Sequence, residues 1–203
     1  MLGSYVRRMG PLWLVVPLSV VAAAAQQTIE ISEPAAVKIG DLFKQADVVA
    51  VVQVLSGDSE NYDTAVYKSK VLMQFKDTAV GEELYFGPFI GYGVGNEYVA
   101  FLRRAKSGPK LKAQRPMQTT IAYGPLEVFH LIMYQGYSIM PVRYACVFGG
   151  KDPCDYGVKV NTDQVKLPKG TKTFPRESGE ELPDASQWVR KGDFLRILNA
   201  SNQ

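Results

Sequence analysis

The only two cysteines of the chain, Cys146 and Cys154, lie eight positions apart in the stretch ACVFGGKDPCDYG. Gly149, Gly150 and Pro153 between them favour a turn that brings the two thiols together. A disulfide closing so short a loop would stabilise the fold by roughly 2 to 3 kcal/mol. A zinc site would need more ligands, and the chain has a single histidine. The spacing therefore predicts a structural disulfide and no metal site.

His130, the single histidine, is the first candidate for acid–base chemistry. It shares the parity of Val128 and Ile132 in an apolar run, which indicates a structural histidine against a sheet. The sequence contains no G-x-S-x-G motif. Two acidic pairs have the pattern of ordinary solvated charges: Glu82, Glu83, Glu180 and Glu181. No catalytic residue and no cofactor is predicted.

Glycines in the stretch GYGVG, at Gly91, Gly93 and Gly95, raise the question of a phosphate loop. The G-x-G-x-x-G pattern would need glycine where Asn96 stands, and no helix is predicted to follow. We expect a connecting loop here, and no phosphate site.

The segment RRAKSGPKLKAQRP is the candidate binding loop of this chain. Its simplest interpretation is a solvated hairpin tip around Gly108 and Pro109, and the alternative is a patch for an anionic ligand. Its cationic residues are Arg103, Arg104, Lys106, Lys110, Lys112 and Arg115.

The first 25 residues have the pattern of a secretion signal. Arg7 and Arg8 precede a short apolar run, and small residues allow cleavage near Ala25. Pro17 interrupts the run, which is shorter than the roughly 20 residues that span a bilayer, so a membrane anchor is the less favoured alternative. We expect a secreted or periplasmic protein with no membrane span in the mature chain.

Export changes the charge of the chain. Removing Arg7 and Arg8 from the 23 basic residues leaves 21 against 20 acidic residues, so the formal net charge falls from +3 to +1. A near-neutral chain gives no global electrostatic argument for binding nucleic acid. Thiols outside the cytoplasm usually oxidise, which supports the predicted disulfide.

The apolar pattern predicts a mainly β fold. A short amphipathic helix is expected over residues 37–46, followed by a strand, ADVVAVVQVLSG, that is apolar on both faces. A barrel strand with the helix packed over it would cover both faces. Apolar and polar residues alternate from Ala65 to Lys76, which predicts a strand with one lysine-rich, solvent-exposed face. Further strands are expected around Leu84 to Phe86, from Glu97, and in two later apolar runs.

The C-terminal part does not continue the pattern of apolar strands. Residues from Val165 onward are polar and proline-rich, typical of a loop or extended arm. The stretch DASQWVRKGDFLRILNA predicts one or two short helices with Asp184 as N-cap and with a docking face. That face comprises Trp188, Val189, Leu195 and Leu198. The expected divisions are a signal peptide (1–25), an N-terminal segment with a short helix (26–45), a β-barrel domain (46–160), and a polar loop with a C-terminal helical extension (161–203).

Two stretches stand out between residues 37 and 104: the ADVV entry into the apolar strand, and GNEYVAFL, Gly95 to Leu102. With these stretches, the order of segments over residues 37–104 resembles the tissue inhibitor of metalloproteinases and netrin-like group. The resemblance implies a small five-stranded barrel of the oligonucleotide/oligosaccharide-binding (OB) type, as in bacterial exported members of unassigned function. The inhibitors chelate their target's zinc through an N-terminal cysteine, whereas no cysteine precedes Cys146 here and Gln26 is the expected first mature residue. No inhibitory residue can therefore be carried over.

Three functions compete at this point. The leading hypothesis is an exported, non-enzymatic binding module whose barrel surface holds an unknown protein or glycan partner. A secreted hydrolase is the second, and substrate turnover would reveal it. Binding of single-stranded nucleic acid or another anionic ligand is the third, with Tyr92, Tyr98 and the basic loop supplying stacking and charge. The signal and the near-neutral charge argue against nucleic acid, so none is expected; the sequence gives no indication of oligomeric state.

Overall fold

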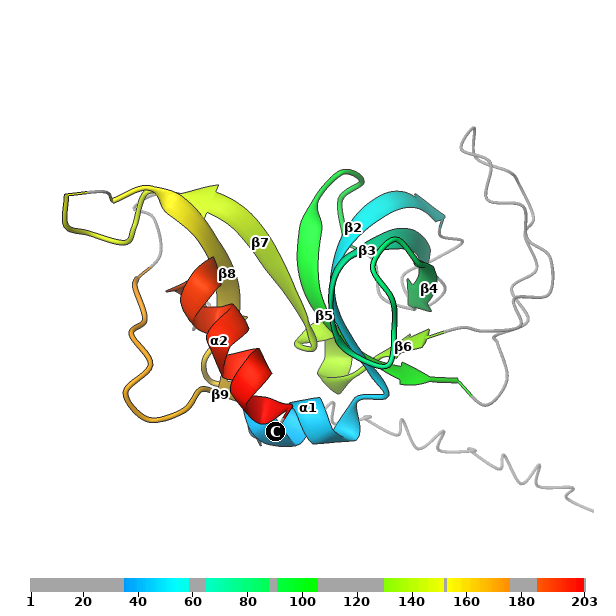
Figure 1. Ribbon diagram of the computed structural model, residues 1–203, viewed down its shortest axis with the longest axis horizontal. Coiled ribbons are helices and arrows are strands. Elements are labelled where there is room, and N and C mark those ends of the chain that lie inside the picture. Colours follow the sequence, from blue (N-terminus) through cyan, green and yellow to red (C-terminus); the bar gives the residue numbers. More distant parts are fainter. Residues whose placement is uncertain are drawn as a thin grey trace, which may run out of the picture. The chain divides into compact units, whose positions relative to one another are not determined.

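The computed structural model describes residues 35–58, 65–87, 91–105, 130–151, 153–175 and 186–202 (Figure 1). The predicted signal peptide with its cleavage near Ala25 lies outside the described residues. The same holds for Lys106, Lys110, Lys112 and Arg115 of the candidate binding loop, and for Glu180, Glu181 and Asp184.

Five strands close into a barrel. They are β2 (Val48–Asp58), β3 (Val66–Lys76), β4 (Glu83–Gly87), β5 (Glu97–Arg104) and β6 (His130–Ile132). The order around the barrel is β2-β3-β4-β6-β5 and back to β2, with every pairing antiparallel except β4–β6. This arrangement confirms the predicted mainly β fold with a small OB-like five-stranded barrel.

Strand β2 is buried on both faces up to Val54, as its apolar sequence predicts, whereas Leu55 near its end is 38% exposed. Val48, Ala50, Val52 and Val54 belong to the cluster that fills the barrel interior. Val49 and Val51 belong to a second cluster on the outside of the barrel and are fully buried. The strand therefore lies between two cores.

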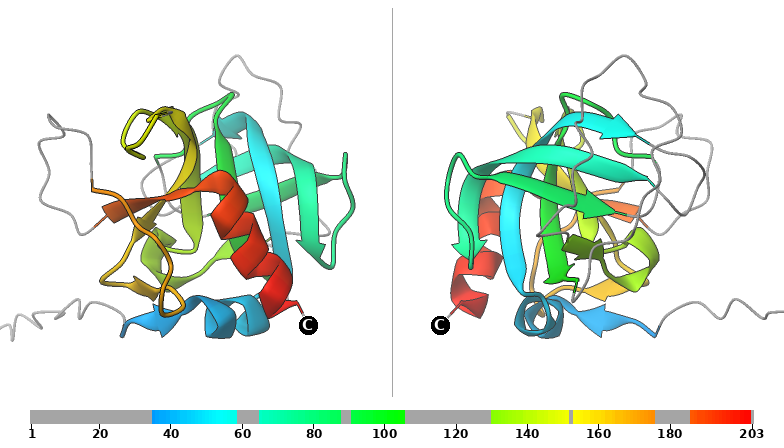
Figure 2. Two further views of the ribbon diagram at one scale, coloured as in Figure 1. Left: turned by 60° about the vertical axis from the view of Figure 1, so that its left-hand side comes forward. Right: turned by 90° about the vertical axis from the view of Figure 1, so that its right-hand side faces the viewer.

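Two helices and a second group of strands cover the outside of β2. Helix α1 (Ile39–Gln45) buries Ile39, Leu42 and Phe43, which confirms the predicted amphipathic helix. Helix α2 (Lys191–Ser201) buries Phe194 and Leu198 in the same outer cluster and ends beside α1 (Figure 2).

The additional strands attach to the barrel along one strand edge. They are β7 (Ile139–Ala145), β8 (Asp155–Asn161) and β10 (Ser186–Arg190). The first half of β5, from Glu97 to Ala100, pairs with β7, and its second half, from Leu102 to Arg104, pairs with β6. Strand β5 is therefore shared by the barrel and by the outer sheet β7-β8-β10. A short 3-10 turn, η2 (Tyr134–Gly136), joins β6 to β7.

Strand β3 differs from its predicted alternation. Three register shifts against β2 break the period of two, so the apolar residues do not all share a face. Tyr67 and Val71 point into the barrel, whereas Phe75 lies in the outer cluster and Met73 is 39% exposed. Lys76, predicted to be on a wet face, is half-buried and donates hydrogen bonds to three main-chain carbonyls at the end of α1: Phe43 (3.2 Å), Lys44 (3.1 Å) and Ala46 (2.5 Å). It acts as a cap for that helix.

The prediction of one or two helices over DASQWVRKGDFLRILNA was wrong for the first part of this stretch. Residues Ser186–Arg190 form strand β10, paired with β8, and only the following residues are helical. Trp188 and Val189 consequently point to opposite faces of the outer sheet, Val189 into the outer cluster and Trp188 into a third cluster with Phe148 and Phe174. Leu195 is half-buried at the edge of the outer cluster.

A two-stranded parallel sheet lies beside α1. It consists of β1 (Val37–Lys38) and β9 (Val165–Lys166), with Val37 opposite Val165 and Lys38 opposite Lys166. Both valines are buried in the outer cluster, so the alternation of the strands directs both lysines outward.

Candidate functional site

The barrel interior is filled, and one end of it is closed by the GYGVG loop. The half-buried ring of Tyr92 lies edge-on to Tyr67, Phe86 and Tyr98, with centroid distances of 5.2, 5.9 and 5.4 Å. The Gly91 N–H donates to the Tyr67 hydroxyl (3.1 Å), and the Gly93 N–H donates to the Tyr98 hydroxyl (2.9 Å).

The aromatic closure has consequences for ligands. Tyr98 is 2% exposed inside the barrel, so its ring cannot stack on a nucleic-acid base. Instead of a phosphate, the N–H groups of Gly91 and Gly93 bind tyrosine hydroxyls. In the described part of the chain, this end of the barrel is therefore occupied by the protein's own side chains.

His130 is the first residue of β6 and lies opposite Arg104, at the end of β5 away from the GYGVG loop. It is 2% exposed, and its Nδ1 is 3.2 Å from the Tyr85 carbonyl oxygen, to which the neutral ring donates. Burial lowers the pKa of His130, and the positive charge of Arg104 lowers it further. The hydrogen bond to Tyr85 and the carboxylates of Glu82 and Asp47 act in the opposite direction. The placement is that of a structural histidine held neutral.

The depressed pKa of His130 predicts a pH-dependent stability. The unfolded chain binds the proton first, so the free energy of unfolding should be constant above the ordinary histidine pKa of about 6.5 and fall below it. The maximal slope is about 1.4 kcal/mol per pH unit, for one proton. Urea unfolding between about pH 7.5 and pH 5.5 measures it.

His130→Gln is the control for this titration, because glutamine can still donate to the Tyr85 carbonyl. Since the chain has one histidine, the variant should show a nearly flat profile over the same range. An equal slope in both proteins would contradict the assignment of the effect to His130.

The candidate binding loop is only partly described. Arg104 is tied down, because its guanidinium pairs with Asp77 (2.7 Å) and its backbone N–H donates to Asp47 Oδ2 (2.8 Å). Arg103 is exposed and lines an open hollow with Gln45 and Tyr134. The Tyr134 hydroxyl donates to Gln45 Oε1 at 2.6 Å. Binding of an anionic ligand by this loop stays a prediction.

The acidic candidates that the structure describes have structural partners. Glu82 accepts hydrogen bonds from the Thr78 hydroxyl and the Ala79 N–H, and these bonds lower its pKa. Glu83 pairs with Lys68 at 2.8 Å. Within the described ranges, no three histidine, cysteine or acidic side chains come together as a metal site.

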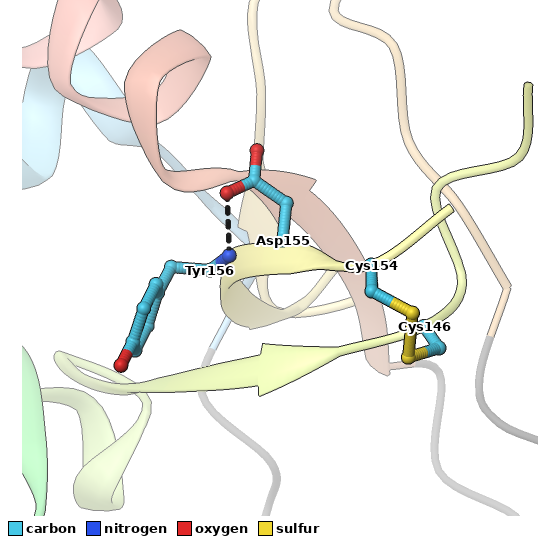
Figure 3. The surroundings of a disulfide bond; sticks show 4 residues. All are labelled: Cys146, Cys154, Asp155 and Tyr156. Carbon is cyan, nitrogen blue, oxygen red and sulfur yellow. Dashed lines mark hydrogen bonds between the residues drawn. A yellow bond between two sulfur atoms is a disulfide. The ribbon is translucent and has the colours of Figure 1, made fainter. Parts of the chain in front are cut away.

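Cys146 and Cys154 form the predicted disulfide, which joins β7 to β8 (Figure 3). Ala145 pairs with Asp155 in the antiparallel ladder, and the disulfide follows at the next pair of positions. Gly157 lies beneath the Phe148 ring, because a Cβ there would be only 2.5 Å from that ring. Arg190 pairs with Asp155 (3.0 Å) and stacks over the Phe148 ring (4.8 Å). These contacts fix the hairpin.

The hairpin presents two exposed tyrosines that sequence reasoning missed. Tyr144 and Tyr156 are directly opposite in the ladder, with ring centroids 5.6 Å apart. They are 62% and 52% exposed. The signal was available, because Tyr144 precedes Cys146 by two positions and Tyr156 follows Cys154 by two. A disulfide-closed hairpin with that symmetry must place both rings on the same face.

One charged group flanks this tyrosine pair, whereas the exposed Arg143 lies on the opposite face of the sheet because successive side chains of a strand alternate. Lys191 lies with its Nζ 5.6 Å from the Tyr156 ring centroid and 3.0 Å from Glu97 Oε2. We refer to Tyr144 and Tyr156 as the hairpin patch.

Comparison with protein-family models, with curated proteins and with solved structures finds no match. No helix in the part of the chain that the structure describes is long and apolar enough to cross a membrane.

Proposed function

We propose that this chain is an exported, non-enzymatic binding module that holds a protein partner on the outside of its barrel, with the hairpin patch as the contact. The carrying observation is the exposed pair Tyr144 and Tyr156 on a hairpin fixed by a disulfide. Tyrosine is, with tryptophan and arginine, one of the residues most enriched among those that dominate binding energy at protein interfaces.

The rigidity of the hairpin supports this role. Association loses free energy when flexible side chains and loops become ordered, and a preorganised surface reduces that loss. The disulfide, the Phe148 ring over Gly157 and the Arg190–Asp155 pair restrain the two strands before any partner arrives. The closed barrel supports this role as well. Its interior is packed with the chain's own side chains, so a partner would bind to the outer surface.

The resemblance to the netrin-like group is consistent with this proposal. Members of that group are exported barrels, and their inhibitors act by contacting another protein. The disulfide is compatible with an oxidising compartment outside the cytoplasm. Export, with cleavage near Ala25, is part of the proposal.

A photo-crosslinking experiment in the producing cells tests the proposed function. A photoreactive phenylalanine analogue at Tyr144 should give a discrete crosslinked adduct with a protein. The same analogue at Val80 or Val94, which are 63% and 64% exposed elsewhere on the surface, should not give that adduct. Identical adducts from all three positions, or none from Tyr144, would contradict the proposal.

Replacing both tyrosines gives a quantitative prediction. Tyr144→Ser with Tyr156→Ser should weaken binding of the crosslinked partner by at least about tenfold, since interface tyrosines commonly contribute more than about 1 kcal/mol each. The melting temperature should change little because both rings are exposed. Val80→Ser with Val94→Ser is the matched control and should bind like the parent.

A further inference from the structure

A second surface, distinct from the hairpin patch, lies beside helix α1. An open hollow of about 360 Å³ is bounded by α1, by the end of β1 and by the segment after β9. A neighbouring hollow shares Lys38, Asp41 and Lys44 with it and continues along α1 toward Tyr134. We call the two hollows together the α1 cleft.

The α1 cleft is strongly cationic. Lys38, Lys44, Lys166 and Lys169 line it and are all exposed, and Asp41 is its one acidic residue. No ion pair among the described residues joins Asp41 to any of these lysines. Lys166 uses one of its donors on the Thr162 carbonyl (2.8 Å), and an ammonium has three. The excess of positive charge in the cleft is therefore available to a ligand.

The backbone register places two of these lysines in an unfavourable arrangement. Lys38 and Lys166 are direct neighbours on adjacent parallel strands, and both point outward because Val37 and Val165 are buried. Like charges directly opposite each other destabilise a sheet. The folded chain gains nothing from this pair by itself, whereas an anion between the two ammonium groups would remove the repulsion.

The other residues that line the cleft indicate which class of anion would bind there. The hollow after β9 contains no arginine, so it lacks the planar fork that recognises a single carboxylate or phosphate in a bidentate manner. This hollow contains no aromatic ring for a sugar to stack on, and Tyr134 of the neighbouring hollow is the one aromatic ring that lines the cleft. Between the lysines its surface is apolar, formed by Leu167, Pro168 and part of Ile39. Acidic side chains alternating with apolar ones match this pattern.

We infer that the α1 cleft binds an acidic segment of a polypeptide, with carboxylates between the lysines and apolar side chains against Leu167 and Pro168. The hairpin patch takes no part in this site, so neither proposal depends on the other. The cleft extends along α1 over two adjoining hollows, which suits an extended segment better than a single small anion.

Fluorescence anisotropy with the full exported chain tests this inference. The probe is a short labelled peptide in which glutamate alternates with leucine, and its partner probe has glutamine in place of glutamate. The acidic peptide should bind, more weakly as salt rises, and the glutamine peptide should bind at least about tenfold more weakly. Equal binding of the two peptides would overturn the inference.

Lysine variants locate the site. Lys38→Gln with Lys166→Gln should weaken binding of the acidic peptide about tenfold, because the variant loses two of the four cationic side chains that line the cleft. Lys70→Gln with Lys151→Gln removes the same charge from exposed lysines elsewhere and should change affinity less than about twofold. Equal losses in both double variants would show diffuse attraction and overturn the site.

Two further measurements complete the test. Near-ultraviolet circular dichroism of the Lys38 and Lys166 variant should match the parent, so that lost binding is not lost folding; if the spectra differ, Lys44→Gln with Lys169→Gln takes its place. Polyglucuronate, an anionic polysaccharide, should compete more weakly than the unlabelled acidic peptide at equal charge concentration. Tighter binding of polyglucuronate would overturn the assignment to a polypeptide.

Discussion

Replacing Val51 by aspartate, or Val52 by aspartate, is expected to abolish the cooperative unfolding transition of this protein. The two side chains point to opposite faces of β2, and each has 0% exposure. Val52 lies in the barrel interior and Val51 in the outer cluster. An unpaired buried carboxylate costs several kcal/mol, comparable with the total stability of about 5 to 15 kcal/mol of a typical domain. Each variant alone should therefore fail to fold.

Circular dichroism during thermal and urea unfolding measures this effect. Lys70→Gln on the neighbouring strand is the control, because Lys70 is exposed, and it should change the free energy of unfolding by less than about 0.5 kcal/mol. If Val51→Asp melts like the parent, the outer face of β2 is not covered. If Val52→Asp melts like the parent, the barrel is not closed around a packed interior at this position.

Replacing Phe194 by alanine is expected to destabilise the protein by about 3 to 5 kcal/mol, the usual cost of truncating a buried aromatic side chain. Phe194 has 0% exposure and belongs to the outer cluster with α1 and β2. The loss should appear as a lower urea midpoint with an unchanged slope.

The neighbouring residue on α2 supplies the control. Leu195 is half-buried at the edge of the same cluster, so Leu195→Ala should cost clearly less than Phe194→Ala. Similar losses for the two variants would indicate that α2 does not dock through the face that Phe194 occupies.

Much of the fold could be predicted from sequence because the decisive signals are local. The uninterrupted apolarity of β2 requires cover on both faces, and a closed barrel with a helix outside provides it. The spacing of Cys146 and Cys154 across glycine and proline predicts the hairpin disulfide. Such features depend only on residues near each other in the chain.

Other features depend on partners far away in sequence. The bulges that divide the apolar face of β3 arise from its pairing with β2, and alternation alone cannot reveal them. Ser186–Arg190 is too short to establish a period, and its pairing with β8 makes it a strand. The hairpin patch and the α1 cleft likewise arise when strands pair, since Lys38 and Lys166 are neighbours only through the register of β1 and β9.

The placement of Val51 and Phe194 in one cluster has a consequence for biogenesis. A chain that emerges from its N-terminal side presents the apolar outer face of β2 long before α2 exists to join the core around it. Contacts between segments so far apart in sequence form slowly, and uncovered apolar strands aggregate in the meantime. The barrel strands alone therefore leave this apolar face uncovered, and we expect the chain to complete its fold only after Phe194 and Leu198 have left the ribosome.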